Sequence, residues 1–279
     1  MKKFLKYFFV AAALVYAFVC ALVYFVPQKL FYNPTKSMSK LENARYYGYQ
    51  AEQLEYESAD GTKLFAWFTR PEPGRDIIVF MHGNSYNIEA FYHKMIPFKE
   101  AGYGTLMPEY RGFGGVAGKI TQQNLEADAI AAVNKLWEMG YLHNRIIIYG
   151  MSLGSHMAVN TVYKLQKRQP FAGLVLEVPF DSLVNVVKDI VPVPMPLSFL
   201  MTDHYDNLEM IDKIDVPVLI MGGEKDALVP VGLAKNLYEH AKQPKKMIIY
   251  SNGEHNNLYN FRNYNDVMLW LEENEKGIQ

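Results

Sequence analysis

One short stretch places a serine between two glycines, in the order Gly150-Met151-Ser152-Leu153-Gly154. A predicted strand at 145–149 precedes it and an amphipathic segment follows, so the serine should occupy a sharp turn from strand to helix. Such a turn exposes the hydroxyl, and the helix N-terminus directs amides at developing negative charge. Gly-x-Ser-x-Gly often occurs by chance, but in this setting it predicts that Ser152 is a nucleophile.

A serine hydroxyl needs a base to take its proton and a carboxylate to orient that base. His255 lies in the loop after the last predicted strand and is the expected base. The other histidines read more simply as structural or surface residues: His82, His93, His143, His156, His204 and His240.

The expected acid is Asp226, which follows the predicted strand at 218–222 and precedes His255. The chain order Ser, Asp, His is that of α/β-hydrolases. Glu224 and Asp181 are alternatives, although the carboxylate of Asp181 is better placed to cap the following helix.

The negative charge that forms on an attacked carbonyl oxygen requires preorganised donors. The backbone amide of Leu153, directly after the nucleophile, is one expected donor. The second is expected from His82-Gly83-Asn84-Ser85 at the end of a strand, where Gly83 lets the loop turn. The Asn84 amide is favoured and the Ser85 amide is held in reserve; the alternative is that this stretch is only a tight loop.

Short β-branched or aromatic runs alternate with longer amphipathic segments, which predicts an α/β fold with a mostly parallel, doubly wound sheet of about eight strands. The first two strands should form a hairpin that turns at Asp60-Gly61. Strands are predicted at 53–57, 64–69, 77–82, 105–109, 146–150, 173–177, 218–222 and 247–251, and helices at 88–101, 122–139, 153–167, 233–241 and 263–274.

The stretch 186–201 interrupts this alternation, because prolines at 192, 194 and 196 prevent a regular strand or helix from continuing through it. It is either a minimal lid over the site or a packed connector. Only 41 positions separate Glu177 from Val218, which leaves no room for a large cap domain.

Residues 7–26 form an uncharged apolar run, long enough to cross a hydrocarbon core of roughly 30 Å. A membrane anchor at 1–27, a linker at 28–50 and a catalytic domain at 51–279 are therefore predicted. The lysines before the run favour a cytoplasmic N-terminus and an extracytoplasmic domain, although lysines after it nearly cancel that bias. The alternatives are a cleaved signal peptide and a lipoprotein signal that uses Cys20.

Overall composition excludes several classes of protein. A formal net charge of −1 leaves no basic excess for a nucleic acid partner. Cys20 is the single cysteine, so the rest of the chain can form neither an internal disulfide nor a cysteine zinc site. No metal or cofactor is expected, and the predicted partner is a small-molecule or lipid acyl substrate at a membrane.

Together these motifs resemble the α/β-hydrolase superfamily, from Gln53 to about Leu271. The N-terminal apolar helix and the motifs QKLFYNP (28–34), HGN (82–84) and YRGFG (110–114) look like the membrane-anchored branch that includes lysophospholipases and protein depalmitoylases. This resemblance implies ester or thioester hydrolysis, with Arg111 architectural rather than catalytic. The chain departs from the pattern at Gly223, where relatives usually carry histidine. The competing expectations are a non-catalytic binding protein, or an acyltransferase or peptidase with the same triad.

Overall fold

The central element is an eight-stranded sheet in the order β10-β9-β8-β7-β4-β6-β3-β2. The structure is a computed structural model that describes residues 2–25, 31–168, 170–190 and 196–277. All neighbouring strands are parallel except at β2–β3 and β3–β6, so the predicted mostly parallel sheet is confirmed. The strands are β2 (Glu52–Glu57), β3 (Lys63–Thr69), β4 (Ile77–Met81), β6 (Gly104–Pro108), β7 (Ile146–Met151), β8 (Gly173–Glu177), β9 (Val218–Gly223) and β10 (Lys245–Tyr250).

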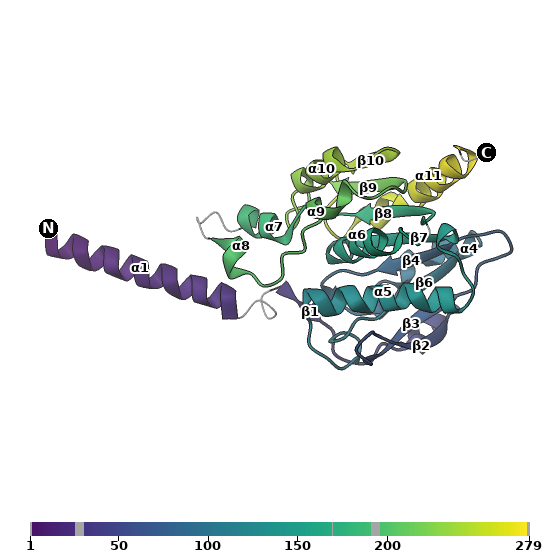
Figure 1. Cartoon of the computed structure of the whole chain (residues 1–279), viewed down its shortest axis with the longest axis horizontal. Helices are drawn as coiled ribbons and strands as arrows, with labels where there is room; N and C mark the ends of the chain where they lie inside the picture. The colour runs from purple at the N-terminus through teal and green to yellow at the C-terminus, as the bar shows by residue number, and fades with distance from the viewer. Residues whose placement is uncertain (1, 26–30, 169, 191–195, 278–279) are drawn as a thin grey trace.

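Helices cover both faces of this sheet (Figure 1). On β4, Ile77 and Val79 point into one apolar cluster, whereas Ile78 and Phe80 point into the other, as the two-residue period of a strand requires. The first cluster includes side chains of α5 (Gln122–Glu138), α6 (Leu153–Leu165) and α10 (Val231–His240), and the second those of α3 (Leu41–Tyr46), α4 (Ile96–Glu100) and α11 (Asn263–Gly277).

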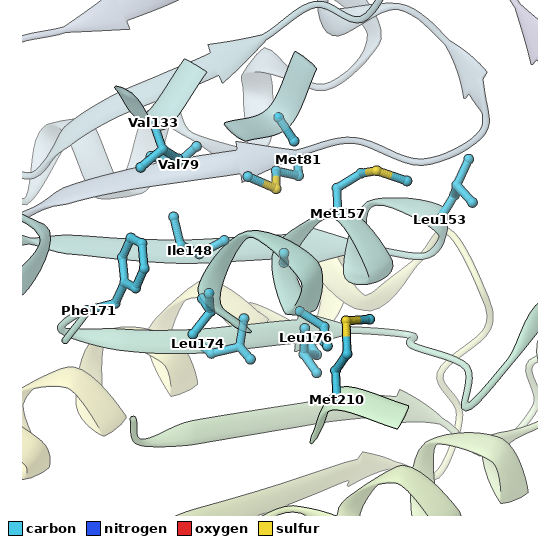
Figure 2. Close-up of a cluster of buried hydrophobic side chains, with 14 of the residues drawn as sticks. Val79, Met81, Val133, Ile148, Leu153, Met157, Phe171, Leu174, Leu176 and Met210 are labelled. Carbon is cyan, nitrogen blue, oxygen red and sulfur yellow. The ribbon is translucent and has the colours of Figure 1, made fainter. Parts of the chain in front are cut away.

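Figure 2 shows how closely α6 packs on the sheet, with Met157 of α6 near Met81 of β4. Every residue from 153 to 162 is buried, so α6 is enclosed on all sides rather than lying on the surface. The helix that follows Ser152 is therefore one of the most firmly held elements of the domain.

The predicted hairpin is confirmed, because β2 and β3 pair antiparallel and Gly61 adopts φ +80° in the turn. The predicted single helix at 88–101 is wrong. This region consists of two 3₁₀ turns, η1 (Ile88–Ala90) and η2 (Tyr92–Lys94), followed by α4. Long-range contacts break the helix, since the Ile88 amide donates to Glu109 and the buried Lys94 side chain reaches Glu177.

Between β8 and β9 the described residues form three short helices, α7 (Leu183–Ile190), α8 (Leu197–Leu200) and α9 (Leu208–Ile211). Pro192 and Pro194 lie outside the described residues, and Pro196 directly precedes α8 as its N-cap. Helix α7 therefore extends into the stretch 186–201 and α8 lies within it, so short helices form where the sequence predicted no regular element. Two further 3₁₀ turns are η3 (His143–Arg145) and η4 (Leu258–Phe261).

Helix α1 (Lys2–Phe25) projects away from the domain (Figure 1). Its residues Lys3–Leu22 are long and apolar enough to span a membrane. An N-terminal signal sequence meets the same criteria, so the choice of an uncleaved anchor stays a prediction.

Within the predicted linker, at 28–50, the described residues are not an extended tether. They contain β1 (Asn33–Pro34) and α3, and Tyr49 is fully buried. β1 pairs in parallel with β5 (Ser85–Tyr86), which immediately follows the predicted oxyanion loop.

Candidate active site

Ser152 lies at the turn between β7 and α6, with φ 53° and ψ −120°. This backbone conformation is rare for a residue with a side chain, and tight surroundings hold it in place. The Ser152 amide donates to the carbonyl of Glu177 at 2.9 Å. A Cβ at Gly154 would collide with the Met81 and His82 carbonyl oxygens, so only glycine allows α6 to approach β4 this closely.

The structure brings Ser152, His255 and Asp226 together, although Ser152 and His255 are 103 positions apart. His255 Nε2 lies 2.9 Å from Ser152 Oγ, and His255 Nδ1 lies 2.7 Å from Asp226 Oδ2. With the proton on Nδ1 donated to Asp226, Nε2 is free to accept the serine proton.

The second carboxylate oxygen of Asp226 is also fully engaged. Asp226 Oδ1 accepts the amides of Leu228 at 2.9 Å and Val229 at 2.8 Å. These two bonds orient the carboxylate so that Oδ2 faces the imidazole. The two alternative acids lie elsewhere: Glu224 is exposed, and buried Asp181 accepts hydrogen bonds from Ser182, Asn185 and Asn236.

The other histidines have partners outside this cluster. His82 is buried with Nε2 3.2 Å from Glu109 Oε1, and His156 lies between Glu126 and Asn207. Within the described part of the chain, neither of these two histidines forms a hydrogen bond with Ser152. Hydrogen bonds from His156 and Gln122 to Glu126 outweigh burial and lower the pKa of that carboxyl.

The predicted oxyanion loop passes directly beside the serine. A Cβ built on Gly83 would lie 3.4 Å from Ser152 Cβ, so the loop and the nucleophile are in contact. Among the described residues, the amides of Asn84 and Leu153 donate to no other protein group. Both amides are therefore available to a ligand, and their role as oxyanion donors stays a prediction.

Residues 31–35, just beyond α1, hold this loop in place. Asn84 donates from its side chain to the Phe31 carbonyl at 2.6 Å, and its own carbonyl accepts the Asn33 amide at 3.0 Å. The contact was not predicted, because nothing local in either segment indicates pairing across roughly 50 residues of chain.

A row of hydroxyl groups ties the same segment to the stretch after α8. Tyr32 Oη donates to Asp203 Oδ2 at 2.9 Å and lies 2.5 Å from Tyr205 Oη. Because Tyr32 uses its hydroxyl proton in the bond to Asp203, Tyr205 must be the donor in the bond between the two tyrosine hydroxyls. Burial, followed by the nearby charge of Asp203, raises the pKa of Tyr32, which keeps its hydroxyl protonated as a donor.

A second network that the sequence did not predict lies beneath the nucleophile turn. Lys94 Nζ donates to Glu177 Oε1 at 2.7 Å, and Tyr149 Oη donates to Glu177 Oε2 at 2.6 Å. Glu177 is fully buried, and its backbone carbonyl accepts the Ser152 amide. The network therefore fixes the position of Glu177, whose carbonyl helps to hold Ser152 in its strained backbone conformation.

An apolar cavity of about 670 Å³ opens beside Ser152 and His255. Its volume is within the range of sites for small molecules, roughly 300–1,000 Å³. Its walls combine the catalytic candidates and the oxyanion loop with side chains of α1, residues 31–32, α7 and the loop after Asp226.

Comparison with known proteins assigns the chain to a family. Residues 89–277 match the prolyl oligopeptidase family. An uncharacterized protein of Mycobacterium tuberculosis (strain H37Rv) is 33% identical over 205 residues, which cover 72% of this chain and 70% of the relative. Human protein ABHD12B is 31% identical over 223 residues, covering 72% of this chain and 61% of the relative.

Among solved structures, an esterase of Pyrococcus furiosus superposes with a TM-score of 0.68 at 19% identity, covering 87% of this chain and 97% of the esterase. At that identity the likeness concerns the fold alone. The sheet order, the turn at Ser152 and the family match lead to one conclusion: this chain belongs to the prolyl oligopeptidase family, within the α/β-hydrolase superfamily of esterases and peptidases.

Proposed function

We propose that this protein is a membrane-tethered serine hydrolase that cleaves acyl esters or thioesters. The observation that carries the proposal is His255, which bridges Ser152 and Asp226 at 2.9 Å and 2.7 Å at the mouth of an apolar cavity. A nucleophile, a base and an orienting acid at these distances are the groups that acyl transfer needs.

In this proposal Ser152 Oγ attacks the acyl carbonyl while His255 Nε2 takes the hydroxyl proton. The amides of Leu153 and Asn84 stabilise the negative charge on the carbonyl oxygen. His255 then returns the proton to the leaving alcohol or thiol, and Asp226 stabilises the imidazolium. Water, activated by the same histidine, releases the acyl group from the serine.

The cavity favours an apolar acyl group. Phe31, Leu183, Val186 and Val187 supply side chains that a hydrocarbon chain can contact without leaving a polar group unpaired. Its position beside an apolar N-terminal helix supports an acyl substrate located in a membrane.

A fluorophosphonate probe tests the proposed nucleophile directly. The wild-type chain is expected to be labelled at Ser152, and Ser152→Ala is expected to remain unlabelled, because only an activated serine attacks phosphorus. The readout is mass spectrometry of the labelled peptide. Absence of labelling in the folded wild type would instead favour a non-catalytic binding protein.

A peptidase is the second candidate, because the family match is to prolyl oligopeptidases. The two activities separate on one panel of long-chain esters, acyl-thioesters, soluble p-nitrophenyl esters and peptide anilides, with Ser152→Ala as the blank. Faster turnover of peptide anilides than of every ester would replace the esterase proposal, and transfer to an added alcohol or amine would identify an acyltransferase.

The Asn84→Ala variant tests the proposed oxyanion loop. It keeps the backbone amide but removes the bond to Phe31, so kcat is expected to fall about 10- to 100-fold with little change in KM. Asn43→Ala is a matched control, because Asn43 also ties the segment before β2 to the domain, through Glu89 and away from Ser152. Equal losses in the two variants would mean that the effect is general destabilisation.

A further inference from the structure

The end of the domain nearest α1 exposes large apolar side chains. Phe199 on α8 is 82% exposed, Ile190 at the end of α7 is 54% exposed, and Leu228 in the loop after Asp226 is 55% exposed. We call these three residues the apolar rim. Ile190 and Leu228 also line the cavity that contains Ser152. An exposed apolar patch around the mouth of a cavity marks an interaction surface.

Helix α1 determines what can cover this rim. Its apolar side chains are exposed around the helix, as at Phe8 (59%), Leu14 (67%) and Phe18 (64%), which is unfavourable in water. A hydrocarbon layer covers such a helix along its length. Helix α1 contacts α8, and Figure 1 shows α7 and α8 on the side of the domain from which α1 extends.

The cavity itself reaches the apolar span. Val19 of α1 lines the same cavity as Ser152, and the apolar span extends to Leu22. At a rise of 1.5 Å per residue, Val19 lies about 4.5 Å inside the end of that span. Amphipathic elements that lie in a membrane interface bury their apolar side chains by roughly 5–10 Å. The part of the cavity wall formed by Val19 therefore lies at about the depth of that interface.

We propose that the apolar rim docks into the headgroup–acyl boundary of a lipid bilayer and that the active-site cavity opens into the bilayer there, along α1. An acyl chain then passes from the lipid layer into the cavity laterally, without crossing water. Docking follows from the rim and α1 alone; the passage of a substrate rests on the proposed function.

The polar side of α7 fits this placement. Val186 and Val187 are buried, whereas Lys188, Asp189 and Ile190 at the end of the helix are exposed. A lysine beside a membrane-embedded residue can extend its ammonium group to the lipid phosphates while its methylene groups remain in the apolar layer.

Brominated lipids test the docking without any need for activity. The full chain is reconstituted in phosphatidylcholine vesicles whose acyl chains carry bromine, which quenches tryptophan on contact. Phe199→Trp is compared with Leu269→Trp, since Leu269 is also exposed (56%, against 82% for Phe199) but lies on α11, at the opposite end of the domain (Figure 1). The wild type provides the background of the native tryptophans.

The Phe199→Trp signal is expected to be quenched in brominated vesicles relative to unbrominated ones, and the Leu269→Trp signal to be unchanged. Equal emission of Phe199→Trp in the two kinds of vesicle would overturn the proposal and leave a protein partner as the cover of the rim. Equal quenching of both variants would also overturn it, because contact would then not be confined to the rim.

The route of the substrate has a separate test. Phe199→Asp is expected to lower turnover of a long-chain ester in vesicles, relative to a short water-soluble p-nitrophenyl ester, by about tenfold. Leu269→Asp is expected to leave this ratio unchanged. An unchanged ratio for Phe199→Asp would overturn lateral entry. If neither ester is hydrolysed and no fluorophosphonate label appears, the proposed function fails while the quenching result still decides the docking.

Discussion

Asp226→Asn is expected to lower kcat about 10⁴-fold, equivalent to roughly 5.5 kcal/mol of transition-state stabilisation. The reason lies in the hydrogen bonds around this carboxylate. Oδ1 accepts the amides of Leu228 and Val229, so the asparagine must keep its oxygen there and turn its NH₂ group toward His255. That group donates to Nδ1, which moves the imidazole proton to Nε2 and prevents it from accepting the proton of Ser152.

Initial rates on a soluble p-nitrophenyl ester, normalised to the folded fraction, measure this loss. Glu224→Gln is the matched control, because Glu224 lies two positions away, is exposed and has no bond to His255. Its activity is expected to stay close to that of the wild type. A large loss of activity in Glu224→Gln with a small loss in Asp226→Asn would show instead that Glu224 is the acid that orients His255.

Arg111→Met is expected to destabilise the fold by about 3–5 kcal/mol while each folded molecule keeps its activity. Arg111 follows β6 and is almost fully buried, with Nη2 2.6 Å from Asp128 Oδ1. The hydrogen bonds that Arg111 donates to the carboxylates of Asp128 and Asp60 raise the pKa of Arg111, so the guanidinium is always charged. Methionine leaves the Asp128 carboxylate buried without its counter-charge, which accounts for the cost.

Urea unfolding of the detergent-solubilised chain, followed by tryptophan fluorescence, measures the stability, and fluorophosphonate titration counts the active sites. Arg70→Met is the control, because Arg70 pairs with Glu52 at the surface, where an ion pair contributes about 0–1 kcal/mol. Adding Asp128→Asn to Arg111→Met is expected to recover part of the loss. Unchanged stability with a large drop in activity per active site would show that Arg111 acts on the substrate.

The sequence predicted the sheet well because each strand carries its own signal. Strands such as β4 and β7 are continuous apolar runs, which is required where helices cover both faces. The expected turn at Asp60-Gly61 is present for an equally local reason, since glycine tolerates the positive φ.

The helix predicted at 88–101 is wrong because local sequence patterns do not include distant contacts. Its pattern is helical, but Lys94 forms a buried ion pair with Glu177, 83 positions away. A pattern in a short window contains no information about a partner that distant, so tertiary contacts overrode the local preference.

The sequence alone determined the α/β class, the turn at Ser152 and the order of Ser152, Asp226 and His255, because each depends on residue types within a few positions of one another. Only the tertiary structure decided that these three side chains meet, that residues 31–35 hold Asn84 beside Ser152, and that Val19 reaches the same cavity. Those contacts join elements far apart in the chain. They arise from the packing of whole strands and helices, whose relative positions no local pattern specifies.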